Sequence, residues 1–140
     1  MKILLPVDGS EYTKRMLAYV AARDDVLGRE HDYFVYTVIP SLPAYATRFL
    51  DKTTVDDYYR DEADSVLRPI REFAAQNGWK AEFAHGHGDA SHAIAAFAQT
   101  FKPDLIVMGT HGHSALANTV LGSVATGVIA RSKAPVLLVR

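Results

Sequence analysis

Cysteine is absent from this 140-residue chain, which excludes disulfide bonds, thiolate metal sites and cysteine nucleophiles. Long apolar runs are also missing, since none approaches the roughly 20 residues that a membrane-spanning helix needs. The first apolar stretch is too short for the core of a signal peptide, and Asp8 interrupts it. We therefore expect a cytoplasmic protein without a membrane span.

An excess of charge of either sign is lacking too, because 15 Lys and Arg face 16 Asp and Glu, for a net charge of -1. This balance argues against a broad electrostatic surface for nucleic acid or anionic lipid, so no nucleic-acid partner is expected. A polyphosphate ligand would have to be bound by local geometry. The chain length and the 49% share of hydrophobic residues are typical of one soluble globular domain, which we expect to span residues 1–140.

Short apolar runs alternate along the chain with segments of helical periodicity. Pro69 lies inside the second periodic segment and predicts a bend near Arg68. Residues 41–54 show no clear period and are predicted to form a loop. The alternation predicts an α/β fold, an open doubly wound parallel sheet with helices on both faces. The predicted strands are 3–7, 33–39, 79–84, 105–108 and 135–139, and the predicted helices are 11–27, 55–77, 91–101 and 123–131.

In open sheets of this kind, ligands bind beyond the carboxyl ends of the strands, where the strand order reverses. Asp8 follows the first strand, and Gly109 follows the fourth. The segment that begins at Gly109 has the spacing Gly-x2-Gly-x9-Gly-Ser. Gly109 and Gly112 are suited to expose consecutive main-chain N–H groups to an anion. Gly122 and Ser123 open a helix whose free N–H groups suit a phosphate, and the Ser123 hydroxyl adds a donor. The segment therefore predicts a phosphate-binding loop.

Other interpretations of these glycines fit less well. A Walker loop requires Gly-Lys-Ser/Thr, a triplet that the chain lacks. A dinucleotide fingerprint requires three glycines after the first strand, where only Gly9 stands. Simple turn glycines are the remaining alternative, but three glycines and a serine at this spacing, between a buried strand and a helix, weigh against it.

At these residues the chain resembles the universal stress protein (UspA-like) family, and specifically its ATP-binding branch. The resemblance rests on the opening Ile-Leu-Leu-Pro-Val-Asp-Gly-Ser, on Val-Met-Gly-Thr-His-Gly at 107–112, on Leu-Gly-Ser-Val at 121–124 and on the closing Pro-Val-Leu-Leu-Val-Arg. It implies a five-stranded parallel sheet in the order 3-2-1-4-5, with ATP and Mg²⁺ lying across strands 1 and 4. It also implies a homodimer joined through the apolar last strand, residues 136–139, since an exposed sheet edge invites pairing.

The resemblance further implies roles for individual residues. Pro6, Val7 and Asp8 would border the adenosine, with the Asp8 carboxylate on the ribose hydroxyls or near Mg²⁺. The alternative for Asp8 is a cap of the turn after the strand. Val38 would meet the adenine edge through its backbone, or would be simple core. The phosphates would be bound by Met108, Gly109, Thr110, Gly112, His113 and Ser114 in the loop, and by Gly122, Ser123 and Val124 at the start of the next helix.

The loop departs from the family in one respect. Many relatives carry Lys or Arg between the second glycine and the Gly-Ser pair, whereas residues 115–118 are Ala-Leu-Ala-Asn here. The phosphate charge would then be met by N–H groups, by Mg²⁺, or by His111 and His113. A neighbouring phosphate favours the protonated form of histidine.

Two further features suggest other chemistry. His85 and His87, with His92, resemble a metal site, but supporting carboxylate or cysteine spacing is missing, so solvated loop histidines are the favoured interpretation. A nucleophilic triad of Ser123, a histidine and Asp8 is disfavoured because the chain has no Gly-x-Ser-x-Gly elbow.

These patterns together predict an ATP-binding regulatory module of the stress response, whose nucleotide state an unidentified partner protein reads. Neither a general base beside a positioned water nor an arginine finger is evident, so slow hydrolysis at most is expected and no catalytic residue is assigned. Two alternatives remain open. One is a slow ATP hydrolase or phosphotransferase on the same site, and the other is a dimeric interaction scaffold that needs no nucleotide.

Overall fold

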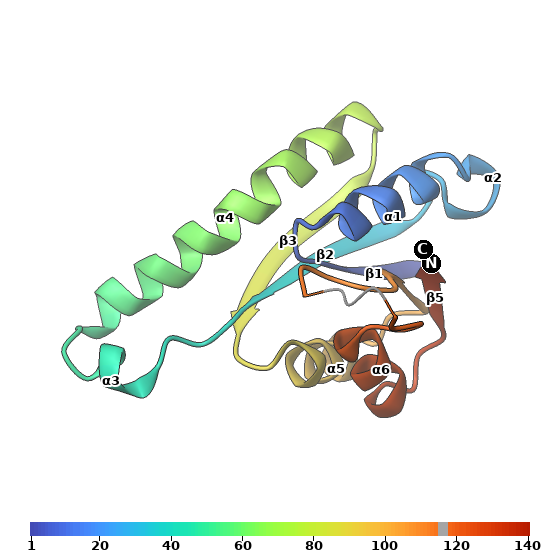
Figure 1. Cartoon of the computed structure of the whole chain (residues 1–140). Coiled ribbons are helices and arrows are strands. Elements are labelled where there is room, and N and C mark those ends of the chain that lie inside the picture. Colours follow the sequence, from blue (N-terminus) through green and yellow to red (C-terminus); the bar gives the residue numbers. More distant parts are fainter. Residues whose placement is uncertain (115–117) are drawn as a thin grey trace.

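The structure is a computed structural model that describes residues 1–114 and 118–140, and it is built on a five-stranded sheet (Figure 1). All strand pairs are parallel, and the strands lie in the order β3-β2-β1-β4-β5. The predicted fold class and strand order are therefore confirmed. In chain order the elements are β1 (Lys2–Val7), α1 (Glu11–Ala21), α2 (Asp24–Leu27), β2 (Asp32–Ile39), α3 (Ala44–Thr47), α4 (Lys52–Gln76), β3 (Lys80–His87), α5 (Ala90–Phe101), β4 (Leu105–Gly109), α6 (Ser123–Arg131) and β5 (Val136–Val139).

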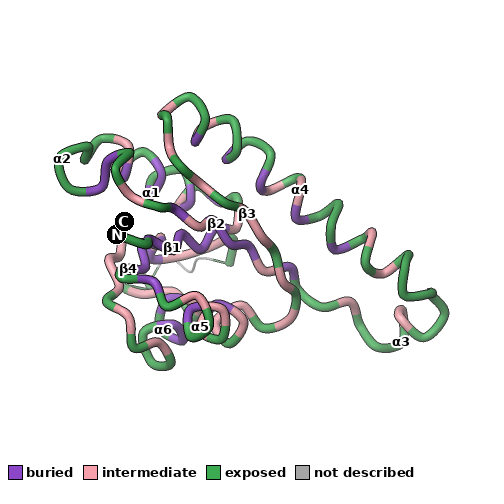
Figure 2. The backbone as a smooth tube through the Cα atoms, turned by 180° about the vertical axis from the view of Figure 1, so that it is seen from behind, coloured by how far each residue is buried: buried purple, intermediate pink, exposed green. Residues whose placement is uncertain are grey.

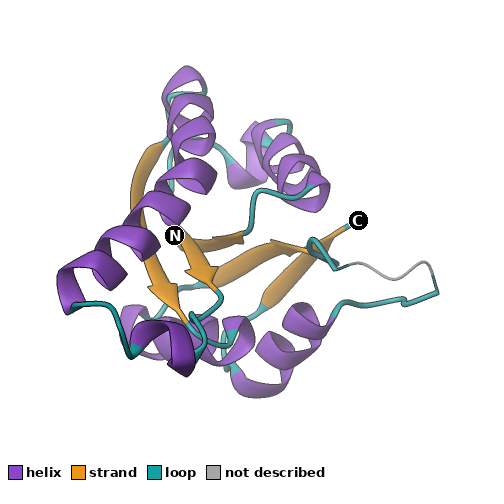
Figure 3. Cartoon of the chain, turned by 60° about the vertical axis from the view of Figure 1, so that its left-hand side comes forward, coloured by secondary structure: helices purple, strands orange, loops and turns teal. Residues whose placement is uncertain are grey.

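Helices cover both faces of the sheet, with α1 and α4 on one side and α5 and α6 on the other (Figures 1 and 3). The central strand β1 shows how the sequence produces this layering. Ile3, Leu5 and Val7 pack into the core under α1 and α4, whereas Leu4 packs into the core under α5 and α6. Burial is accordingly continuous along the central strands (Figure 2). A strand covered on both faces has to be apolar throughout, which is why unbroken apolar runs identified these strands.

The single helix predicted over residues 11–27 is wrong, because the chain forms two helices there. α1 ends when the backbone of Arg23 leaves the helical region, at φ -110° and ψ 52°, and α2 begins at the next residue. The buried hydroxyl of Tyr33 donates to the carbonyl groups of Leu27 and Gly28, the latter at 2.9 Å. This contact from β2 fixes the end of α2 at a place that helical periodicity alone does not mark.

The predicted loop 41–54 also contains more structure than expected. It holds the short helix α3, and α4 begins at Lys52 because the Asp51 carboxylate accepts the main-chain N–H of Thr54 at 2.7 Å. α4 then continues through Pro69 to its end without interruption. Buried residues of α4 on both sides of the proline, among them Leu67 and Ile70, hold this long helix on the sheet.

β3 extends three residues beyond its predicted end at Ala84, because it pairs with β2 as far as Ile39 and His87. The His85-Gly86-His87 segment is therefore strand and not loop. Among the helices formed by the described residues, none combines the length and the apolar character needed to cross a membrane.

Candidate functional site

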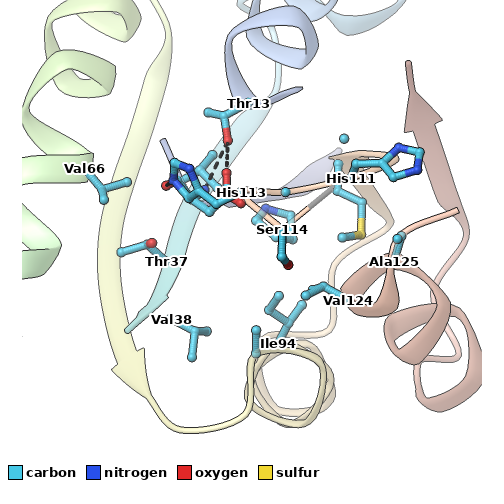
Figure 4. A pocket seen from close by; sticks show the side chains of 18 of the residues that line it. Thr13, Thr37, Val38, Val66, Ile94, His111, His113, Ser114, Val124 and Ala125 are labelled. Atoms are coloured by element: carbon cyan, nitrogen blue, oxygen red, sulfur yellow. Dashed lines mark hydrogen bonds between the residues drawn. The ribbon is translucent and has the colours of Figure 1, made fainter. Parts of the chain in front are cut away.

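A cavity of about 640 Å³ opens where the carboxyl ends of β1 and β4 meet, at the reversal of strand order (Figure 4). Its walls come from the ends of β1, β2 and β4, from α4, α5 and α6, and from the segment after β4. The structure thus brings together residues that are more than 100 positions apart in the chain. Of the thirteen residues implied by the resemblance, the twelve in the lining are Pro6, Val7, Asp8, Val38, Met108, Gly109, Gly112, His113, Ser114, Gly122, Ser123 and Val124.

Thr110 is the implied residue that does not line the cavity. Only 7% of its surface is exposed, and its main-chain N–H donates to the carbonyl of Val139 at 3.0 Å. Its own carbonyl accepts the N–H of Gly122 at 2.7 Å. Thr110 therefore ties the beginning of the loop to β5 and to the start of α6, which is a structural task.

The structure shows one of the two roles that the sequence left open for Asp8, the cap of the turn after β1. Its Oδ1 accepts the main-chain N–H of Ser10 at 2.9 Å and the hydroxyl of Thr13 at 3.0 Å, so one oxygen caps the turn into α1. Its Oδ2 lies directly against Gly112, since a Cβ added to the glycine would stand 2.4 Å from that oxygen, and both residues line the cavity. The turn is stabilised by one oxygen, and the other is presented to the cavity.

The three glycines of the motif, Gly109, Gly112 and Gly122, are needed because neighbouring atoms pack closely against them, and not because their backbone conformation is unusual. Positive φ values occur at other glycines of the chain but not at these three. A Cβ on Gly122 would lie 2.9 Å from the carbonyl oxygen of Thr110, and one on Gly112 would collide with Asp8. The loop can therefore lie against β1 and α6 only where side chains are missing.

At the start of α6 some main-chain N–H groups are hydrogen-bonded within the fold and others are not. The N–H of Gly122 is used by the Thr110 carbonyl, and the helical ladder begins with Thr126, which donates to Gly122 at 3.0 Å. The N–H groups of Ser123 and Val124 precede that ladder, and neither donates to another described residue. These two groups are placed to meet an anion at the positive end of the helix.

The two histidines of the loop differ in position. His111 is held at both ring nitrogens, since Nε2 donates to the carbonyl of Thr119 at 2.7 Å and Nδ1 lies 2.9 Å from the Thr110 hydroxyl. It thereby braces the two ends of the loop. The Nε2–H of His113 donates to the main-chain carbonyl of Asp8 at 2.7 Å, which links the loop to β1. Both side chains stabilise the loop, and both residues line the cavity (Figure 4).

α4 contributes to the cavity lining, which was not predicted from the sequence. Tyr58, Glu62 and Val66 recur at intervals of four residues, so one stripe of the helix reaches the lining. That period is visible in the sequence, but its direction depends on how α4 crosses the strand ends. His111, which the sequence suggested as a partner for phosphate charge, also lies in the lining. The other lining residues that were not predicted are Thr13, Thr37, Ile39, Pro40, Ala90, Ile94, Thr119 and Ala125.

Two of the three histidines considered for a metal site, His87 and His92, are engaged in other contacts. The His87 ring stacks on Tyr59 with centroids 4.3 Å apart, and the imidazole of His92 lies 2.5 Å from the Asp89 carboxylate. Hydrogen bonds from His92, and then from Ser91, lower the pKa of Asp89 to about 2. Within the described residues, no cluster of three or more metal-ligating side chains is found.

The triad considered for Ser123 gains no support from the geometry. Ser123 is the first residue of α6 and lines the cavity. No hydrogen bond among the described residues connects its hydroxyl to a histidine.

Comparison with known proteins agrees with this architecture. The model of the universal stress protein family matches residues 1–140. Universal stress protein MJ0531 of Methanocaldococcus jannaschii is 33% identical over 147 residues, which cover 99% of this chain and 81% of that protein. The solved structure of MJ0577 from the same organism has a TM-score of 0.82 and 28% identity, and the match covers 99% of this chain and 94% of that one.

Solved structures of more distant proteins with this fold include nucleotide complexes. The universal stress protein from Archaeoglobus fulgidus in complex with dAMP has a TM-score of 0.70 and 22% identity, covering 100% of this chain and 98% of that one. A family protein from Arabidopsis thaliana with AMP bound has a TM-score of 0.71 and 14% identity, covering 99% and 90%. At these low sequence identities the comparison shows a shared fold. The family match over the whole length shows that this chain belongs to the universal stress protein family.

Proposed function

We propose that this chain binds ATP together with Mg²⁺ in the cavity at the ends of β1 and β4, and acts as a cytoplasmic, single-domain regulatory module of the stress response. The observation that carries the proposal is the convergence of three separate segments, 6–8, 108–114 and 122–124, on one cavity of about 640 Å³. Pockets of this size accommodate small-molecule ligands. The nucleotide complexes of proteins with the same fold support the choice of an adenine nucleotide.

The lining suggests how the parts of the nucleotide would be distributed. Apolar and aromatic side chains, including Val38, Pro40 and Tyr58, form the β2 and α4 side and suit an adenine ring. The Asp8 Oδ2 suits ribose hydroxyls, which are hydrogen-bond donors. Ser123 and the adjoining N–H groups of α6 suit phosphate oxygens.

The residues present fit Mg²⁺ held jointly with a nucleotide. In nucleotide sites this ion is usually bound by one or two carboxylates together with phosphates and waters. The Oδ2 of Asp8 offers one such carboxylate oxygen, because the turn into α1 uses Oδ1. When bound, Mg²⁺ would offset phosphate charge. The absence of a three-ligand cluster among the described residues is consistent with an ion that enters with the nucleotide.

Regulation, and not fast turnover, is the proposed use of the site. The described lining contains no arginine or lysine that could stabilise a transferring phosphoryl group, so hydrolysis would be slow at most. The bound nucleotide would instead set a state that a partner protein reads. We further propose a homodimer through β5, because this apolar strand forms one edge of the sheet. Sedimentation at the mass of two chains would support the dimer, and sedimentation as a monomer would contradict it.

The direct test of binding is to denature freshly purified protein and identify any released nucleotide by mass spectrometry. Titration calorimetry with ATP and Mg²⁺ then measures affinity in the wild type and in Val38→Trp, which fills the apolar side of the cavity. Val26→Trp on α2 is the matched control, because Val26 is 59% exposed and does not line the cavity. We expect at least about tenfold weaker binding in Val38→Trp only.

Two outcomes would contradict the proposal. Protein that releases no adenine nucleotide and shows no thermal shift with ATP would leave only the nucleotide-independent scaffold. Equal affinities for wild type and a folded Val38→Trp variant would place any nucleotide outside this cavity. Phosphate release in a single-turnover experiment, lost in Asp8→Ala with binding retained, would instead favour the slow hydrolase.

A further inference from the structure

The fixed charges that line the nucleotide cavity are negative. Asp8 and Glu62 contribute carboxylates, and the described lining residues include neither Lys nor Arg. The loop residues outside the description, 115–117, are Ala, Leu and Ala in the sequence and add no charge. Phosphate oxygens would therefore meet main-chain N–H groups and hydroxyls, which are dipoles and carry no net charge.

The loop histidines use their Nε2–H groups within the fold. The Nε2–H of His111 donates to the carbonyl of Thr119, and the Nε2–H of His113 donates to the carbonyl of Asp8. An N–H group committed to a carbonyl of the fold is not directed at a ligand. Both imidazoles therefore act here as braces of the loop.

A lysine does lie beside the cavity, but in a different compartment. A groove of about 450 Å³ between α1 and α4 shares Asp8, Thr13 and His113 with the cavity and includes Lys14 in its own lining. The Lys14 ammonium stands 3.8 Å from the Glu11 carboxylate, and its side chain is 73% exposed. Solvent and this partner screen the lysine, so its attraction for a phosphate in the cavity is weak.

This charge distribution affects a longer phosphate chain more than a short one. The dipoles at the start of α6 suit one phosphoryl group. ATP brings two additional phosphoryl groups into a cavity where the Asp8 and Glu62 carboxylates repel them. The repulsion is stronger from the half-buried Asp8, because Glu62 is exposed and solvent screens its charge. A divalent cation bound to the phosphates removes much of that repulsion.

We infer that the cavity selects adenine nucleotides by phosphate charge: AMP binds equally well with and without a metal ion, whereas ATP binds tightly only together with a divalent cation. The inference rests on the proposed function, and it assigns the selectivity to the two lining carboxylates and to the missing cation in the loop. It follows that a single cation introduced into the lining should allow metal-free ATP to bind.

Titration calorimetry with AMP and with ATP, each in a chelator and in excess Mg²⁺, tests this inference. In chelator, we expect ATP to bind wild-type protein at least about tenfold more weakly than AMP, and Mg²⁺ to abolish the difference. AMP affinity should change less than about twofold with Mg²⁺. Wild-type protein that binds ATP in chelator as tightly as AMP would overturn the inference. Failure of both nucleotides to bind would instead overturn the proposed function.

Two pairs of variants locate the effect. Thr119→Lys adds a cation to the lining, and Val120→Lys adds the same charge at a residue that is 86% exposed and outside the lining. Glu62→Gln removes a carboxylate from the lining, and Glu72→Gln removes one from the same helix outside the lining; both side chains are exposed. We expect roughly tenfold tighter ATP binding in chelator for Thr119→Lys, a smaller gain for Glu62→Gln and no gain for the controls. Equal gains in ATP affinity within each pair would show a long-range charge effect and would refute the assignment of selectivity to the lining residues. If Thr119→Lys does not fold, the comparison of Glu62→Gln with Glu72→Gln still tests the inference.

Discussion

Substituting Gly112 by alanine should destabilise the protein through a collision with Asp8 that can be calculated from the structure. The added Cβ would stand 2.4 Å from the Asp8 Oδ2, whereas ordinary contact begins at 3.4 Å, so the two groups must separate by 3.4 - 2.4 = 1.0 Å. The carboxylate cannot move freely, because Oδ1 accepts hydrogen bonds from Ser10 and Thr13. Overpacking of this kind costs about 1–3 kcal/mol, and the lower entropy of the unfolded alanine chain offsets about 0.4–1 kcal/mol.

The expected net loss from Gly112→Ala is about 1–2 kcal/mol of unfolding free energy, or roughly 3–7 °C in Tm. Urea denaturation monitored by circular dichroism measures it. The decisive measurement repeats the substitution in an Asp8→Ala background, where no carboxylate remains to collide with the new methyl group. There Gly112→Ala should be neutral or slightly stabilising, so the two substitutions should couple by more than about 1 kcal/mol. Equal costs in both backgrounds would refute the steric explanation.

Three further predictions concern the fold around the site. Burial, and to a smaller extent the nearby Asp24 charge, raises the pKa of Tyr33 from 10.0 to about 12. The Tyr33 phenol therefore contributes stability that is complete below pH 10 and is lost as pH rises through about 12. An ultraviolet titration in which every tyrosine ionises near pH 10 would contradict this prediction. Asp89, with its pKa lowered from 3.8 to about 2, contributes stability present above pH 3.8 and lost as pH falls through about 2, so Asp89→Asn should flatten acid unfolding in that window. Tyr59→Phe removes the hydroxyl that accepts the Leu42 N–H at 2.9 Å, and it should lower the unfolding free energy measured by urea denaturation by about 0.5–1.5 kcal/mol. An unchanged unfolding free energy would show that this hydrogen bond does not stabilise the fold.

The sheet could be predicted from the sequence because its central strands are buried on both faces. The unbroken apolar runs of β1 and β4 leave little choice of element, and the alternation with helices leaves little choice of topology. The ends of the helices were harder to predict from the sequence. The end of α2 depends on the Tyr33 hydroxyl reaching back to the Leu27 carbonyl, a contact between elements that local periodicity does not contain.

The candidate site was predictable to the extent that it follows from strand ends and glycines. Asp8, Gly112 and Gly122 were found by their positions, but the reason for the glycines, close approach to Asp8 and to Thr110, needed the folded structure. The α4 stripe through Glu62 was missed because the crossing of a helix over strand ends is set by packing along its whole length. That omission left the charge balance of the cavity unknown at the level of the sequence.

The two oxygens of the Asp8 carboxylate make different contacts, and this limits how the site can be altered by mutation. One oxygen caps the turn and the other lies against Gly112 at the cavity, so a substitution that removes the second oxygen also removes the first, except for the amide replacement Asp8→Asn. Variation that tunes ligand preference without endangering the turn must therefore accumulate on the periphery, at residues such as Glu62 and Thr119. Homologous chains with different preferences should differ there first, while the aspartate itself stays unchanged.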